Sequence, residues 1–129
     1  MSDSIFFEGP KYGEELDYYF NICEVAIGSI GLHRIGFEGA ATLKIREYIS
    51  RGIPFVISAN DLSKALPSNF YVKTEANDKP LDINSVILFL ESTNSSGLEQ
   101  SMRSYAENNL TWNRQFEKIF NKITDLDLN

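Results

Sequence analysis

Residues 32–48 contain most of the side chains in this chain that could bind an anionic ligand. His33 and Arg34 follow an apolar, strand-like run, and a glycine-rich loop then leads into a predicted helix start. Such a helix start presents unpaired backbone N–H groups and the positive end of the helix dipole to a phosphate. Arg34 and Lys44 could add positive charge, and His33 could contact a sugar hydroxyl. The candidate residues are therefore His33, Arg34, Ala40, Ala41, Thr42, Leu43 and Lys44.

This corner also has a simpler explanation. Thr42 could merely cap the helix, because threonine is a favoured residue at that position. A lone histidine such as His33 is more often structural than functional. The residues by themselves leave both interpretations open.

Glu47 is the candidate acidic residue of the same helix. Its carboxylate could accept hydrogen bonds from two neighbouring ribose hydroxyls, as acidic residues do in other nucleotide-binding folds. The alternative is an exposed carboxylate that pairs with Lys44 or Arg51 at helical spacing, which stabilises a helix by only a few tenths of a kcal/mol.

Strands and helices alternate around this segment. Short apolar runs predict strands at 5–7, 25–29, 54–58 and 70–72, and apolar residues at helical spacing predict helices at 13–21, from 41 or 42 to about 49, 86–90, 96–109 and 112–123. The run 25–29 is apolar on both faces, which is typical of a strand between two helix layers. This order predicts an α/β fold, namely a partial Rossmann-like domain of about four mostly parallel strands with flanking helices and a helical C-terminal tail.

The last predicted helix has one apolar stripe. Thr111 is the expected cap of this helix. The stripe is expected to pack into the core or against segments outside this chain. Its residues are Trp112, Phe116, Ile119, Phe120 and Ile123.

Length and composition set limits on the function. A chain of 129 residues with 43% apolar and 23% charged residues is expected to form one globular domain. The net charge of −6, without clustered basic residues, argues against binding to nucleic acid or to an anionic membrane. One cysteine and one histidine cannot build a Cys/His metal site. No apolar run is long enough to span a membrane, and the polar N-terminus is unlike a signal peptide, so we expect a cytoplasmic protein or one peripheral to the inner membrane.

The motifs of the chain resemble the C-terminal, donor-binding lobe of bacterial two-lobed glycosyltransferases of the retaining group 1 type. They are Ile-Phe-Phe-x-Gly from Ile5, Gly-Glu-Glu-Leu-Asp from Gly13, Ala-Ile-Gly-Ser from Ala26, His33-Arg34, Leu-Lys-Ile-Arg-Glu-Tyr from Leu43, Arg-Gly-Ile-Pro-Phe from Arg51, and the terminal pieces Met-Arg-Ser-Tyr-Ala from Met102 and Leu-Thr-Trp-Asn from Leu110. The resemblance covers about residues 5–123. It is most specific between His33 and Pro54.

The resemblance implies that the helix start holds the diphosphate of a nucleotide sugar and that Glu47 binds the ribose. In that family a first glutamate, separated from the second by seven intervening residues, contacts the sugar. The matching position here is Gly39, and Glu38 lies one residue away. Either Glu38 reaches the sugar through a shifted loop or the sugar contact is lost. Like Gly39, Glu38 is therefore a candidate donor-binding residue.

The resemblance also implies what the chain lacks. The family's enzymes have an N-terminal acceptor lobe, and an Arg–Lys pair in earlier units of the donor lobe neutralises the diphosphate; neither has a counterpart before Ile5. We therefore expect residues 1–129 to form one domain, the latter part of a donor lobe. That domain should be inactive without the other lobe.

The predicted function is the nucleotide-sugar-binding portion of a hexosyltransferase-type glycosyltransferase of polysaccharide biosynthesis, with no catalytic residue assigned and no cofactor or metal. Its expected partners are a nucleoside-diphosphate sugar, an N-terminal lobe or partner chain, and a second copy, because missing units would leave an unpaired sheet edge. The alternative is a non-catalytic α/β interaction module or subunit that retains the fold. Gly39 favours this alternative, whereas Glu47 favours the enzyme.

Overall fold

The computed structural model describes residues 4–37, 42–58, 66–93 and 97–126. A parallel sheet in the order β1-β2-β3 forms its centre, with Ala26 opposite Phe55 and Val56 opposite Val72. The elements in chain order are α1 (Gly13–Ile22), β1 (Ala26–Ile27), the 3₁₀ helix η2 (Leu32–Ile35), α2 (Leu43–Arg51), β2 (Phe55–Ser58), the 3₁₀ helix η4 (Ser68–Phe70), β3 (Tyr71–Thr74), α3 (Ile83–Thr93), α4 (Leu98–Asn109) and α5 (Trp112–Leu126). The predicted α/β class with a parallel sheet is therefore confirmed.

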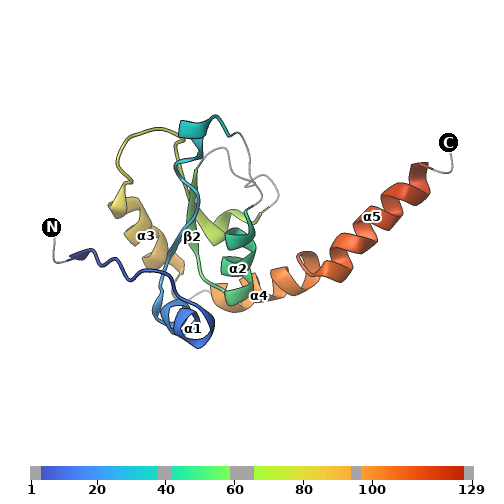
Figure 1. Cartoon of the computed structure of the whole chain (residues 1–129), viewed down its shortest axis with the longest axis horizontal. Helices are drawn as coiled ribbons and strands as arrows, with labels where there is room; N and C mark the ends of the chain where they lie inside the picture. The colour runs from blue at the N-terminus through green and yellow to red at the C-terminus, as the bar shows by residue number, and fades with distance from the viewer. Residues whose placement is uncertain (1–3, 38–41, 59–65, 94–96, 127–129) are drawn as a thin grey trace.

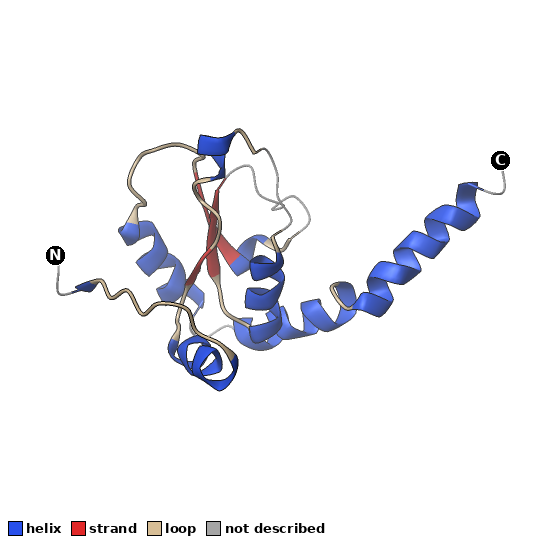
Figure 2. Cartoon of the chain, viewed as in Figure 1, coloured by secondary structure: helices blue, strands red, loops and turns tan. Residues whose placement is uncertain are grey.

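The body of the molecule has three layers. Figures 1 and 2 show the strands between α3 on one side and α2 with α4 on the other. Successive strand residues face opposite sides of a sheet, so Phe55 and Ile57 face the α2 and α4 side. They form one buried cluster with residues of β1, α2, η4 and α4. The buried members of this core are Ala26, Ile45, Ile49, Ile53, Phe55, Ile57, Phe70, Leu98, Met102 and Ala106.

The helix α2 forms close to where the sequence predicts it. Ile45 and Ile49 lie one turn apart and are both buried, which confirms the predicted inward face, while Ala41 of that face lies outside the described residues. The hydroxyl of Tyr48 donates to the carbonyl of Ile27 over 3.2 Å and ties α2 to β1. Gly52 then ends the helix in the left-handed region, with φ 75°.

One strand prediction in the N-terminal part is wrong, and another is confirmed only over a shorter range. Residues 5–7 form no strand, and Ile5, Phe6 and Phe7 are 65%, 75% and 97% exposed. An apolar triplet becomes a strand only when a neighbouring strand pairs with it. None of the described strands pairs with residues 5–7. In the run predicted at 25–29, only Ala26–Ile27 is a strand, and Ile27 is 45% exposed because β1 lies at the sheet edge. The described sheet therefore has three strands rather than about four.

The predicted helices at the C-terminus form, but only α4 buries its apolar face. Leu98, Met102 and Ala106 of α4 are buried against the core, as predicted. The helix α5 begins after Thr111, whose hydroxyl accepts a hydrogen bond from the backbone N–H of Arg114 over 3.4 Å. Figure 1 shows that α5 extends away from the body. Its stripe is exposed, so the expectation that it joins the core of this chain is wrong.

None of the described helices combines the length and the apolar composition needed to span a membrane.

Candidate functional site at the carboxyl edge of the sheet

The candidate site lies at the edge of the sheet where the strands end. All three strands are parallel, so the segments that follow β1 and β3 leave the sheet at the same edge. Ligands of open α/β sheets bind at this edge. Between the two segments is a cavity of about 200 Å³, whose lining includes His33 and Arg34 from η2 and Thr74, Glu75 and Asp78 from the end of β3 and beyond. The structure therefore brings two predicted site residues to a cavity at the expected edge.

His33 and Arg34 share one acidic partner. Arg34 Nε donates to Asp78 Oδ1 over 2.6 Å, and His33 Nε2 lies 3.1 Å from the same oxygen. The His33 side chain is mostly buried, at 18% exposure, whereas Arg34 and Asp78 are 68% and 71% exposed. These hydrogen bonds lower the pKa of the Asp78 carboxyl below its ordinary value. The carboxylate of Asp78 thus contacts both predicted ligand-binding side chains.

The lowered pKa of Asp78 leads to a pH-dependent stability prediction. A carboxyl with a depressed pKa in the folded state stabilises that state above its unfolded pKa, and this contribution disappears as the pH falls through the folded value. We expect the Asp78→Asn variant to be less stable than the wild type at about pH 6 and equally stable at about pH 2, below the carboxylate range. Urea unfolding of both proteins at the two pH values measures this difference. An unchanged difference at low pH would contradict it.

The start of α2 is the positive end of a helix dipole. The first turn of α2 contains no acidic residue, and both Leu43, at 79% exposure, and Lys44 are exposed. Thr42 is the N-cap residue by position, but its side chain makes no capping hydrogen bond. The hypothesis that its hydroxyl caps the helix is therefore wrong. The other predicted residues of this corner, Glu38, Gly39, Ala40 and Ala41, lie outside the described residues.

Two buried polar side-chain atoms have no hydrogen-bond partner within the described part of the chain. They are Nδ1 of His33 and Oγ1 of Thr42, and both belong to predicted ligand-binding residues. The two residues flank the segment that connects η2 to α2. A buried polar atom without a partner costs about 1–3 kcal/mol, and native proteins contain few of them. Such a cost at two predicted binding residues calls for an explanation.

Glu47 makes a structural ion pair. Its Oε1 accepts from Arg51 Nε over 3.2 Å and lies 3.1 Å from a terminal nitrogen of the same guanidinium. Arg51 also donates to Asp17 of α1 over 2.7 Å and lies 4.2 Å from the ring centroid of Phe20. The Arg51 guanidinium thereby fastens α1 to α2. The pairing with Arg51 that the sequence offered as an alternative is present, and both contacts use Oε1 of Glu47.

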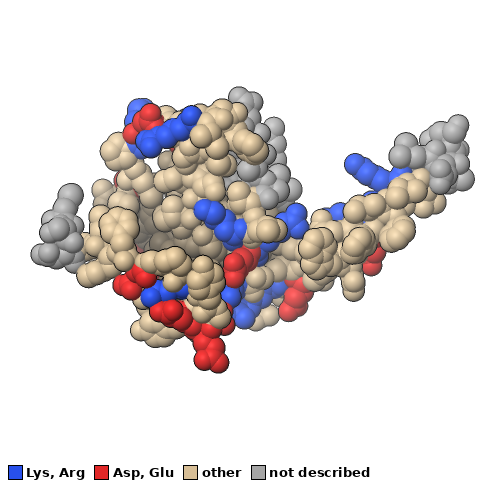
Figure 3. Space-filling view, in the orientation of Figure 1, with Lys and Arg blue, Asp and Glu red and all other residues tan. Residues whose placement is uncertain are grey.

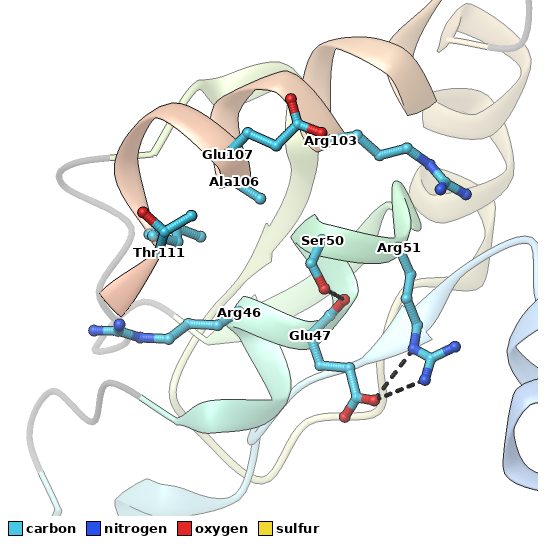
Figure 4. Close-up of a pocket in the computed structure, with 9 residues that line it drawn as sticks. Arg46, Glu47, Ser50, Arg51, Arg103, Ala106, Glu107 and Thr111 are labelled. Carbon is cyan, nitrogen blue, oxygen red and sulfur yellow. Dashed lines mark hydrogen bonds and ion pairs between the residues drawn. The ribbon is translucent and has the colours of Figure 1, made fainter. Parts of the chain in front are cut away.

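A larger groove of about 530 Å³ lies between α2 and α4. Figure 4 shows Arg46 and Arg103 pointing toward opposite ends of this groove, while Glu47 turns toward Arg51. Arg103 pairs with Glu99 over 2.8 Å, and Arg51 is held by Glu47 and Asp17. Because most of the charge in the groove is already paired within the protein, we assign no chemistry to it.

Asp78 is the site residue that the sequence analysis misses. Its only local signal is its place in a polar turn, Asn77-Asp78-Lys79-Pro80, soon after β3. In that turn Asn77 Oδ1 accepts from the backbone N–H of Lys79 over 2.9 Å, which fixes the turn. The contact of Asp78 with Arg34 spans 44 residues of sequence, so no local pattern could reveal it.

Comparison of the chain with protein-family models, with curated proteins and with solved structures finds no significant match. Any assignment of function therefore depends on the geometry of the site and on the motifs of the sequence.

Proposed function

We propose that the carboxyl edge of the sheet binds a nucleoside-diphosphate sugar. In this proposal the chain is a Rossmann-like, donor-binding portion of a glycosyltransferase that transfers a sugar to a glycan or another acceptor in the cytoplasm or at the inner membrane. Transfer itself requires the acceptor lobe. The proposal assigns the diphosphate to Arg34 and to the start of α2.

The observation that carries this proposal is the cavity of about 200 Å³ at the carboxyl edge of the sheet, whose lining includes His33 and Arg34. A guanidinium and an imidazole can donate hydrogen bonds to the phosphate and hydroxyl oxygens of a nucleotide sugar. The positive end of α2 and the guanidinium of Arg34 favour an anion at the same edge. Arg34 Nε donates to Asp78 Oδ1 over 2.6 Å, so a carboxylate oxygen fits beside this guanidinium.

We assign Glu47 no part in this proposal. It lines the groove between α2 and α4 and pairs with Arg51, whereas other residues line the cavity beside His33 and Arg34.

Titration calorimetry with uridine- and guanosine-diphosphate sugars tests the proposal. We expect wild-type binding with a dissociation constant of about 1 mM, which corresponds to only about −4 kcal/mol. We expect Arg34→Ala to weaken binding about tenfold, because a charge-assisted hydrogen bond to phosphate is among the stronger polar contacts.

Arg114→Ala is the matched control for this titration, since Arg114 of α5 is also exposed and pairs with an acidic side chain, Glu117, over 2.7 Å. Its affinity should equal that of the wild type. The proposal is wrong if neither sugar nucleotide binds at about 10 mM, ten times the expected dissociation constant, or if Arg114→Ala weakens binding as much as Arg34→Ala.

The second candidate function is a non-catalytic interaction module with the same fold. It is favoured by large apolar side chains that are exposed on the N-terminal segment, α3 and α5, including Phe7, Leu88 and Trp112. Exposed apolar surface of this extent marks interaction sites in soluble proteins. The titration separates the two candidates, because an interaction module has no reason to bind a sugar nucleotide.

A further inference from the structure

The most unusual surface of the molecule is the apolar stripe of α5. Five large side chains lie on one face of this 15-residue helix, and each is about half exposed or more. They are Trp112, Phe116, Ile119, Phe120 and Ile123, at 77%, 53%, 53%, 64% and 49% exposure. Among residues 112–125, Gln115 alone is partly buried, through its hydrogen bond to the carbonyl of Asn109 over 2.7 Å. The stripe is therefore not covered by any of the described elements.

The whole chain exposes more surface area than a monomeric protein of the same mass usually does. The chain exposes 9615 Å², whereas monomeric proteins of 14.6 kDa expose roughly 6900 Å². The difference is roughly 2700 Å² per chain, or roughly 5400 Å² for two copies. This is at the upper end of the area that the two partners of an obligate dimer bury together, about 2000–5000 Å² or more. Part of the difference comes from α5, which Figure 3 shows as an arm that projects from the body.

We propose that α5 is a dimerisation helix and that its stripe packs against the stripe of α5 in a second copy of this chain. The residues Trp112, Phe116, Ile119 and Ile123 follow one another at intervals of four, three and four. This alternation is the spacing of helices that pack side by side along a narrow seam. A symmetric pair, in which the same patch is used on both copies, is the commonest form of protein oligomer.

The charges also favour a second copy over a lipid surface. A helix that binds anionic lipid carries mainly Lys and Arg on its polar face. The polar part of α5 instead mixes three basic residues with Glu117 and Asp125, and Glu117 neutralises Arg114 at 2.7 Å. The chain as a whole has a charge of −6, whereas α5 has one more basic than acidic residue. Contact through α5 therefore keeps the net negative charge of the two chains away from the interface.

The position of α5 leaves room for the proposed contact between two copies. Because α5 extends from the body as Figure 1 shows, two such helices can lie side by side while the two bodies stay apart. The cavity beside His33 and Arg34 lies at the carboxyl edge of the sheet, between elements other than α5. The inference is therefore independent of the proposed function, and a titration without sugar-nucleotide binding would leave it standing.

Sedimentation equilibrium of the full chain tests the pairing. We expect the wild type to have twice the mass of one 14.6 kDa chain, and Phe116→Glu to reduce the apparent mass twofold. The stripe residues are exposed and do not belong to the buried core cluster, so the body of this variant should keep its far-UV circular dichroism. Asn121→Glu introduces the same charge on the opposite face of α5, and this control should remain dimeric. A monomeric wild type, or a Phe116→Glu variant that remains dimeric, overturns the proposal.

Cross-linking identifies which surface pairs. In a Cys23→Ser chain, Ile119→Cys should form a covalent dimer with a short bis-maleimide, whereas Asn121→Cys should not. Equal cross-linking at both positions would mean that the stripe is not the seam. Binding of the monomer to vesicles of anionic lipid, with no dimer in solution, would assign the stripe to a membrane surface instead and overturn the proposal as well.

Discussion

Replacing Gly52 by alanine is expected to lower the free energy of unfolding by about 3 kcal/mol, because two costs add at this position. Gly52 ends α2 with φ 75°, a conformation that side-chain-bearing residues adopt only at a cost. A Cβ at Gly52 would also collide with α4, since it would touch Glu99 Cγ and lie 2.9 Å from the Glu99 carbonyl oxygen. The Cγ can move away, but the backbone oxygen of α4 cannot move without shifting Leu98 and Met102 in the core. Urea unfolding measures the loss.

Gly36 provides the control that separates the two costs. It ends η2 with φ 65°, but a Cβ there would meet nothing within 4 Å. Gly36→Ala should therefore cost only the left-handed strain of about 1–2 kcal/mol. Gly31→Ala, with neither a positive φ nor a close neighbour, should change stability by less than about 0.5 kcal/mol. If Gly36→Ala and Gly52→Ala are equally destabilising, the tight contact between α2 and α4 is not the reason.

The elements around α2 show what the sequence does predict. Ile45 and Ile49 repeat at helical spacing, Gly52 and Pro54 mark the end of the helix, and the following apolar run becomes the central strand β2. Each of these signals is local, and each agrees with its neighbours. The same holds for α4, whose Leu98, Met102 and Ala106 are buried as their spacing predicts. Because these local signals agree, this part of the fold can be predicted from the sequence.

The N-terminal segment and α5 show what the sequence cannot predict. Periodicity identifies the residues that share a face, but it says nothing about which surface covers that face. In α4 the face lies against α2 and the core, whereas in α5 a stripe of equal clarity is exposed. The contact that covers a stripe is formed by tertiary or quaternary packing, which a local pattern does not contain. The assignment of Phe116 and Phe120 to the core fails for this reason.

The candidate site is predictable to a similar extent. The position of His33 and Arg34 after a strand indicates the carboxyl edge, and the structure places both at a cavity there. Their partner Asp78 comes from a segment beyond another strand and is brought close by the parallel pairing of β2 with β3. For Glu47, spacing allowed both a ligand role and a pair with Arg51. The sequence does not reveal that Arg51 also donates to Asp17 of α1, a contact formed only in the fold. Through this contact the pair of Glu47 and Arg51 connects α1 to α2.

The largest loss of stability is expected from Phe55→Ala, about 4 kcal/mol. Phe55 is completely buried in the central strand, and its ring centroid lies 6.1 Å from that of Tyr48 and 5.9 Å from that of Tyr71. Alanine removes the buried area and leaves a cavity that β2, paired on both sides, cannot close. Because small domains are stable by only about 5–15 kcal/mol, this change removes a large part of the stability of the fold. Urea unfolding followed by circular dichroism measures it.

Phe7→Ala is the matched control for the same measurement. Phe7 belongs to the apolar triplet that the sequence predicts as a buried strand, but its side chain is 97% exposed. With no packing to lose, Phe7→Ala should change stability by less than about 0.5 kcal/mol. A loss comparable to that of Phe55→Ala would mean that residues 5–7 are buried in the folded protein after all. The same Phe-to-Ala change at the two positions thus distinguishes Phe55, which is buried in the core, from Phe7, which is exposed.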